Sequence, residues 1–304
     1  MSTRTSVTFD ATIGWLKRRA PIIFLVVSCG AALLGSSLAT YQAQGRRSES
    51  VRIATALLPP RMYANGTGQE ADIIRAALAK VGDHSRIEFF ALPFTRQWSA
   101  FQRDSRFDAV AMVPTKAAIK EFDVDTPAIP QVLLSGFPSK AYIWYHNGIV
   151  FRPKDFPTGL GRTPIRALYG KRVVAFAGAS AILTDLEYNR RLFSLYVERG
   201  DQFEHSQMLQ SGAVDAVVAD RLIIDQYNKE IGGGRYPEIS ENLEFDAVYC
   251  PTPYLIVFRR QELQQKFDKG LAMLKSSGEL ASINERYLRR VGLRSVARPE
   301  GKCN

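Results

Sequence analysis

The sequence has few of the residues that most often carry catalysis or bind metals. It contains three cysteines and three histidines in 304 residues, and His84, His146 and His205 are isolated from one another. It has no Gly-x-Ser-x-Gly and no His-Glu-x-x-His motif, and the three glycines at 232–234 lack the Lys-Ser/Thr pair of a phosphate-binding loop. No metal-ligand spacing is present. We therefore predict no catalytic residue, no metal site and no cofactor.

The body of the chain has almost no excess of positive charge, although the formal net charge of the whole chain is +10. Residues 1–50 hold six basic and two acidic residues, and residues 286–304 hold six basic and one acidic. The 235 residues between them carry a net charge of only +1. A nucleic-acid site needs a basic stripe interleaved with aromatic side chains, which is missing. We predict no nucleic-acid partner and interpret the basic tail at 293–304 as solvated or membrane-facing.

One long apolar run is present, at residues 20–41, directly after a basic triplet at 17–19. Its length suffices to span a bilayer, and the basic flank favours a membrane anchor with the N-terminus inside the cell. A small-x-small site at 37–39 is equally typical of a cleaved signal peptide. Cys29, after Val-Val-Ser, resembles a bacterial lipobox and is a candidate for lipidation. Each alternative places residues 51–304 in the periplasm or otherwise outside the cytoplasm, either tethered to the inner membrane or secreted.

The two remaining cysteines are Cys250 and Cys303. An exported domain could join them in a disulfide, because export leads to an oxidising compartment. Pairing requires the two Cα atoms to lie within about 7 Å, which a sequence does not give. The sequence therefore leaves this disulfide as a possibility.

Helices and short apolar strands alternate through residues 51–292, which predicts an α/β fold. Continuous apolar strands of this kind are typical of a mostly parallel sheet covered by helices. The predicted strands include 51–56, 87–92, 107–115, 173–177 and 214–220, and the predicted helices include 68–81, 98–103, 181–186 and 263–274, with 278–287 after it. A strand-rich stretch at 141–151 is expected to cross between two lobes, and residues 242–249 to cross back.

Two of these strands end on a polar residue, at Thr115 and at Asp220. Ligands bind beyond the carboxyl ends of strands in such sheets, so we expect both residues to face one cleft. A third candidate is Ser180, which follows Gly178 at the start of a helix, where free N–H groups and the helix dipole can hold an anion. The alternative for Asp220 is a helix cap, a common role of aspartate.

Several segments, in order, resemble the bacterial extracellular solute-binding protein family 3, the polar amino acid-type periplasmic binding proteins of ABC importers. The similarity spans about residues 51–292 and is most specific at 267–287, a helix, a Ser-Gly-Glu-Leu turn and an Ile-x-x-x-Tyr helix. It implies a type II fold of two α/β lobes joined by two hinge strands, with ligand held between them. Lobe 1 would comprise 51–142 and 250–292, and lobe 2 would comprise 143–249.

The resemblance also implies roles for single residues. Thr115 and Asp220 match positions that bind the ligand in this family. The acidic residue at the position of Asp220 holds the α-amino group of the ligand. The arginine that clamps the ligand carboxylate is replaced by Ala118, which puts an ordinary α-amino acid ligand in doubt. We hypothesise that Arg61 or Arg96 restores the positive charge. Other candidates for ligand contact are Tyr63, Trp144, Tyr145 and Ser180.

The resemblance implies a monomeric protein that captures a small polar solute, amino acid-like or related, for an ABC-importer permease. One alternative is a membrane-tethered sensory or accessory domain that binds a solute without feeding an importer. Another is a dehydratase-like enzyme on the same fold.

Overall fold

The computed structural model describes residues 50–94, 96–115, 128–232, 243–296 and 303. Residues 50–304 form one compact unit. The predicted apolar segment at 20–41, with Cys29, and the position of Ala118 lie outside the described residues. In the ranges that are described, every helix is too short or too polar to cross a membrane.

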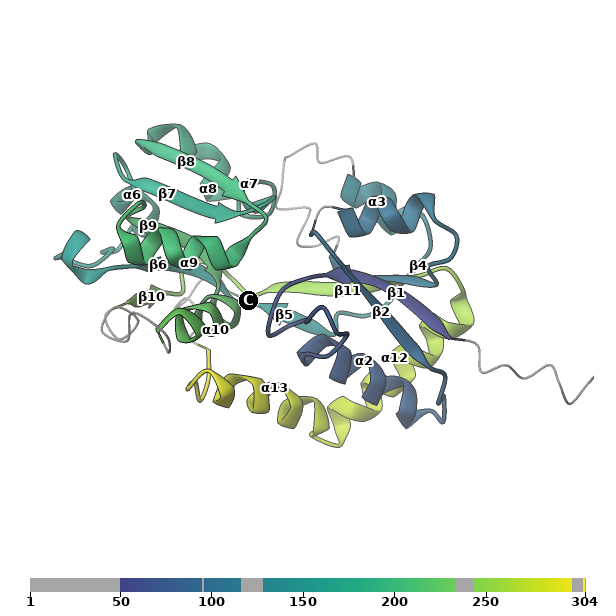
Figure 1. Ribbon diagram of the computed structural model, residues 1–304. Helices are drawn as coiled ribbons and strands as arrows, with labels where there is room; N and C mark the ends of the chain where they lie inside the picture. The colour runs from purple at the N-terminus through teal and green to yellow at the C-terminus, as the bar shows by residue number, and fades with distance from the viewer. Residues whose placement is uncertain (1–49, 95, 116–127, 233–242, 297–302, 304) are drawn as a thin grey trace, which may run out of the picture. The chain divides into compact units, whose positions relative to one another are not determined.

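The first sheet contains strands from both ends of the unit (Figure 1). In this sheet β1 pairs in parallel with β2 and β3. The strand β11, from the C-terminal part of the chain, runs antiparallel to β3, β4 and β5. The order is β2 (Ile87–Leu92), β1 (Val51–Ala56), β3 (Ala109–Pro114), β11 (Thr252–Phe258) and β4 (Phe137–Pro138), with β5 (Ile143–Tyr145) also paired to β11.

Helices cover both faces of this sheet, because the strand residues are apolar on both faces. Successive strand residues point to opposite sides, so Ile53 packs into one core cluster and Ala54 into the other. The first cluster includes side chains from α2 (Gln69–Lys80), α12 (Gln261–Ser276) and α13 (Glu279–Arg290), and the second from α3 (Arg96–Arg103) and α5 (Ala128–Leu134).

The second sheet is built from the middle of the chain. Its order is β10 (Glu244–Asp246), β6 (Asn147–Phe151), β9 (Ala216–Asp220), β7 (Arg172–Phe176) and β8 (Leu195–Arg199). One face packs on α7 (Ala179–Ile182) and α8 (Thr184–Asn189), and the other on α9 (Gln202–Ser211) and α10 (Arg221–Gly232). Short helical segments complete this lobe: α6 (Pro164–Ala167), η1 (Pro153–Asp155) and η2 (Arg190–Leu192).

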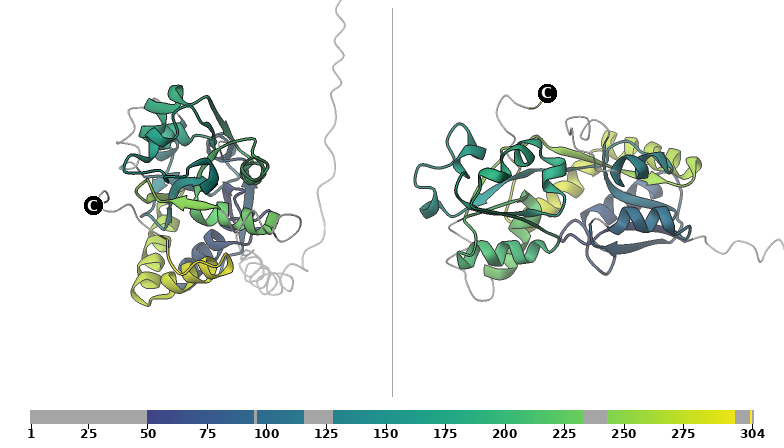
Figure 2. Two further views of the ribbon diagram at one scale, coloured as in Figure 1. Left: turned by 90° about the vertical axis from the view of Figure 1, so that its left-hand side faces the viewer. Right: turned by 90° about the horizontal axis from the view of Figure 1, so that it is seen from above.

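The chain crosses between the sheets twice, and seen from above the two groups of elements are distinct (right-hand view of Figure 2). The first crossing lies between Tyr145 on β5 and Asn147 on β6, so residues 143–145 pair with the first sheet rather than with the second. The chain returns between β10 and β11. The Asn147 side-chain amide donates to Thr252 Oγ1 at 3.5 Å, which connects the two crossing segments.

A disulfide joins Cys250 and Cys303, whose Cα atoms lie 5.5 Å apart. Cys250 lies just before β11, on the returning crossing segment. The bond therefore fastens the C-terminal segment to the connection between the two sheets. It is the pairing that the sequence left open.

Gly270 in α12 gives a test of how closely the first lobe is packed. An alanine Cβ at this position would lie 1.7 Å from the backbone carbonyl oxygen of Ala77 in α2. We expect Gly270→Ala to lower the free energy of unfolding by about 1–3 kcal/mol or more, because the backbones must separate. Met273→Ala, at a 40% exposed position of the same helix, is the control and should change it by less than about 0.5 kcal/mol. Urea unfolding followed by circular dichroism measures both, and equal effects would contradict the close contact.

Candidate functional site

A small cavity lies between the two sheets, with walls from both lobes. The first lobe contributes Leu58, Phe94, Met112, Tyr145 and Tyr254, and the second contributes Asn147, Phe176, Gln202, Asp220 and Ile223, among others. Its volume is about 20 Å³, which is room for about one water molecule. Apolar contacts continue on either side, since Phe94 packs against the cores of both lobes. The lobes are therefore closed on this site.

Asp220 is held at the cavity wall by the backbone around it. It ends β9 opposite Asn147 in the register of the second sheet. Its carboxylate accepts from the backbone N–H of His146 at 2.8 Å and of Ile223 at 3.2 Å. The second of these bonds caps the N-terminus of α10, so the helix-cap role considered from the sequence is present. The same carboxylate nevertheless faces the cavity.

Arg61 occupies the position next to Asp220 where a cationic ligand group was expected. Its Nη2 donates to both carboxylate oxygens of Asp220, at 3.0 and 2.8 Å, across 159 residues of sequence. Its Nη1 donates to Gln69 of α2, and Nη2 also reaches the carbonyl oxygen of Trp144 at 3.3 Å. Both side chains of the ion pair are almost fully buried, at 4% and 2% exposed. Arg61 thus contacts the first lobe, the crossing strand and the second lobe at once.

The environment of Arg61 keeps its charge. The guanidinium carbon lies 4.3 Å from the ring centre of Tyr145, a cation–π arrangement. Burial is the largest single effect and lowers the pKa of Arg61, but the charge and hydrogen bond of Asp220, together with the charges of Tyr145 and Glu70, raise it by more, so the net shift is upward. Arg61 and Asp220 form a buried salt bridge, with Nη2 and Oδ2 2.8 Å apart.

Ser180 and Gly178 lie at the predicted anion-binding turn, and another carboxylate of the chain already binds there. The backbone N–H groups of Gly178 and Ser180 donate to Glu198 at 2.7 and 2.8 Å. Tyr196 donates its hydroxyl to the same carboxylate at 2.6 Å. Burial raises the pKa of Glu198, but hydrogen bonds from Ser180, Tyr196 and the two backbone groups lower it to a net downward shift.

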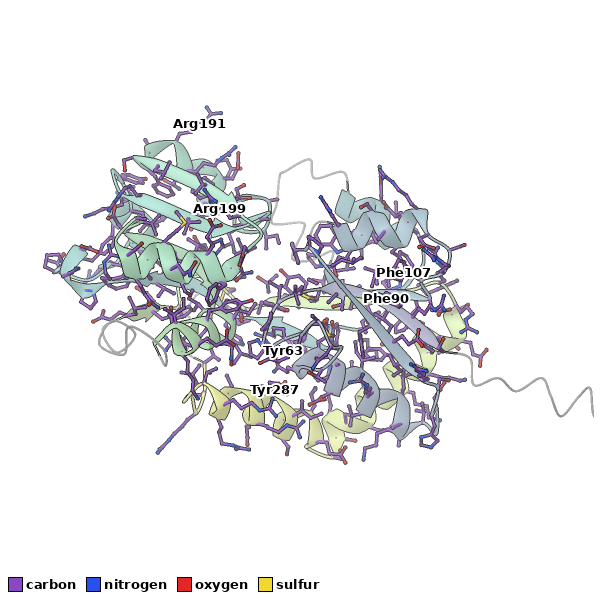
Figure 3. The ribbon with its side chains drawn as sticks, in the orientation of Figure 1. Tyr63, Phe90, Phe107, Arg191, Arg199 and Tyr287 are labelled. Atoms are coloured by element: carbon purple, nitrogen blue, oxygen red, sulfur yellow. A yellow bond between two sulfur atoms is a disulfide. The ribbon has the colours of Figure 1, made fainter. Side chains whose placement is uncertain are left out.

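The other predicted site residues lie away from the cavity lining. Tyr63 is on the loop before α2 (Figure 3), where burial raises its pKa and its charged neighbours are Glu230 and Arg290. Arg96 is exposed at the start of α3. Thr115 follows β3, and its N–H donates to the carbonyl oxygen of Pro253. Of the candidates named from the sequence, the structure brings together Arg61, Asp220 and Tyr145.

Several lining residues carried no sequence signal. Gln202 begins α9 and is 7% exposed, and its side-chain oxygen has no hydrogen-bond partner in the described part of the chain. Asn147 is buried beside Asp220. Met112 has a left-handed backbone with φ of 53° inside β3, a strained conformation for this residue type. It lies opposite a register irregularity in β11. Such positions depend on the fold, not on a motif.

No protein-family model and no curated protein sequence matches the chain. Solved structures do match it. An ancestral arginine-binding protein bound to arginine is 24% identical, with a TM-score of 0.58, and the match covers 78% of this chain and 97% of that one. The chain has the two-lobed periplasmic-binding fold.

Two further structures show the same similarity of fold. A histidine kinase sensor domain, described as similar to periplasmic binding proteins, is 17% identical with a TM-score of 0.60, over 81% of this chain and 98% of that one. A substrate-binding protein of an ABC uptake transporter from Streptococcus pneumoniae, with bound histidine, is 16% identical with a TM-score of 0.58, over 84% and 97%. These identities support the fold alone.

A buried acidic group lies behind the site, in the first lobe. Glu70 of α2 is fully buried and accepts hydrogen bonds from the hydroxyls of Thr55 and Tyr142. Burial raises its pKa to about 7, although these two hydroxyls and the charge of Arg61 act in the opposite direction. Tyr142 immediately precedes β5. The protonation of Glu70 is therefore linked to the region that holds Arg61.

This shift predicts a pH dependence of stability. Because the pKa of Glu70 is higher in the folded than in the unfolded protein, the folded state binds more protons and loses stability as pH rises from about 4.5 to 7. Glu70→Gln should remove this loss, so that its stability relative to wild type rises across that range by on the order of 3 kcal/mol.

Urea unfolding of both proteins between pH 4.5 and 8 measures the difference. His205 has the opposite effect, since burial lowers its pKa to about 4, so its contribution is lost as pH falls from about 6.5 to 4. That contribution is common to both proteins and cancels in the comparison. A difference independent of pH would contradict the raised pKa of Glu70.

Proposed function

We propose that the chain is an extracytoplasmic solute-binding protein whose two lobes close on a small polar solute. The observation that carries this proposal is the cavity at the crossing strands, which has walls from both lobes. Asp220 belongs to the second lobe and Tyr254 to the first, and both line it. Sites between two hinged lobes are typical of proteins that enclose a ligand completely.

Solute entry requires the lobes to separate. A cavity of about 20 Å³ holds a water molecule but no amino acid. The two crossing segments, at 145–147 and 246–252, are the connections about which separation can occur. Hinge motion about a few residues at the ends of strands is a common route to ligand capture.

The similar structures support a small solute of amino-acid size. The ancestral protein is described with bound arginine, and the streptococcal protein with bound histidine. The present chain has a cavity lined by polar, aromatic and aliphatic side chains. The site contains no group of three or more histidine, cysteine, aspartate or glutamate residues able to hold a metal, as far as the described ranges extend. The similar structures are described as binding proteins and a sensor domain, which supports binding without turnover.

Delivery to an importer permease is our first candidate for the role of binding. Sensing is the second, because a histidine kinase sensor domain has the same fold. Deletion of residues 51–304 distinguishes the two in cells. Loss of uptake of the identified solute supports delivery, whereas unchanged uptake with a lost transcriptional or signalling response supports sensing.

Asp220 provides the test of binding at the cleft. A thermal-shift screen of the protein against amino acids, polyamines, organic acids, small peptides and small uncharged amides identifies the solute, because ligand binding to the native state raises the melting temperature. Asp220→Ala should then weaken binding of that solute at least tenfold, since Asp220 orients the wall of the cavity. The control is Asp225→Ala, which removes a carboxylate of α10 that pairs with Arg221. Equal affinities of wild type and Asp220→Ala by calorimetry would exclude this cleft as the site.

A further inference from the structure

The charge at the cavity wall is already neutralised within the protein. Asp220 is the one formally charged residue among those that line the cavity in the described structure. Its two oxygens accept from Arg61, His146 and Ile223. A cationic solute would have to displace the Arg61 guanidinium, which itself is bonded to Gln69 and Trp144. The counter-cation of Asp220 is therefore part of the chain.

The turn that could hold an anionic group is also occupied from within. Glu198 accepts from the N–H groups of Gly178 and Ser180, and from the hydroxyl of Tyr196. Both terminal nitrogens of Arg61 are used within the protein, on Gln69, Asp220 and Trp144, and its Nε is the one guanidinium donor without a partner among the described residues, so Arg61 cannot grip a carboxylate with two terminal nitrogens while it is paired with Asp220. A zwitterionic solute thus finds no free carboxylate at these two places, and only the single Nε–H of Arg61 as an unpartnered donor.

The remaining lining is uncharged. Leu58, Phe94 and Phe176 provide apolar surface, and two buried amides lie beside them. The Gln202 side-chain oxygen has no partner among the described residues, so it offers a buried acceptor. The Asn147 amide makes only a long contact, at 3.5 Å, to Thr252. A buried polar group without a partner is costly, and a ligand donor would remove that cost.

We propose that the cleft selects a small uncharged solute with an apolar body and a hydrogen-bond donor, and that Arg61 is the built-in counter-cation that excludes charged solutes. This inference rests on the proposed solute-binding function and narrows its solute class. Charged groups are excluded because each would be buried between the lobes without a free group of opposite charge beside it.

Removal of Arg61 should change the class of ligand. We expect propanamide, an uncharged probe, to raise the melting temperature of the full-length protein in detergent, while alanine, guanidinium and acetate at equal concentration do not. Arg61→Ala exposes the Asp220 carboxylate, so it should bind guanidinium at least tenfold more tightly than wild type. The double variant Arg61→Ala/Asp220→Ala should lose this gain. Circular dichroism confirms that each variant is folded.

The reciprocal variant keeps the proposal testable if Arg61→Ala fails to fold. Asp220→Asn preserves the shape of the side chain and its capping oxygen but releases the charge of Arg61. We expect it to bind acetate at least tenfold more tightly than wild type, by calorimetry. Asp215→Asn, which alters a second-lobe carboxylate paired with Arg172, is the control and should show no gain.

The outcomes separate this inference from the function on which it rests. Binding of alanine or guanidinium by the wild type as tight as by Arg61→Ala overturns the uncharged class but leaves solute binding intact. If Arg61→Ala binds guanidinium no more tightly than wild type, and Asp220→Asn binds acetate no more tightly, with both variants folded, the role of Arg61 is overturned. A wild-type protein that binds no solute of any class contradicts the proposed function itself.

Discussion

The salt bridge between Arg61 and Asp220 is the contact on which the arrangement of the site depends. It joins a loop of the first lobe to the end of β9 in the second, and Arg61 also contacts the first crossing strand through Trp144 and Tyr145. Removing one partner of a buried pair typically costs about 3–5 kcal/mol, because the other charge is left without compensation. Here the lobes can relieve that cost by separating, since water then reaches the remaining charge. The pair therefore couples the charge of the cleft to its closure.

Much of the fold follows from local pattern. The strand predicted at 87–92 has the same bounds in the structure, and the strands predicted at 107–115 and 214–220 correspond to β3 and β9. The residues of β3 and β9 are buried on both faces, which is why their continuous apolar pattern was informative. The edge strand β8 was missed because it is only partly buried, with a polar sequence. The helix predicted at 181–186 is instead divided between α7 and α8, with Leu183 in an extended conformation between them.

The site was less accessible to sequence reasoning than the fold. Asp220 was selected because it ends an apolar strand, and it does line the cavity. Arg61 was selected to compensate for a missing arginine, but its partner in the structure is Asp220, 159 residues away, and no spacing rule predicts such a contact. Gln202 and Glu198 had no signal, since Glu198 reaches Gly178 and Ser180 only when β8 pairs with β7, and Gln202 reaches the cavity only when α9 packs on the second sheet. Contacts across a cleft depend on tertiary packing, whereas the positions of strands are indicated by the local sequence pattern.

The central claim is that Arg61 and Asp220 interact with each other across the cleft. A double-mutant cycle tests it most directly, with urea unfolding of the wild type, Arg61→Ala, Asp220→Ala and the double variant. We predict a coupling free energy of at least about 1.5 kcal/mol, with the double variant more stable than the sum of the single losses implies. Losses that add to within about 0.5 kcal/mol would show independent residues and contradict the account.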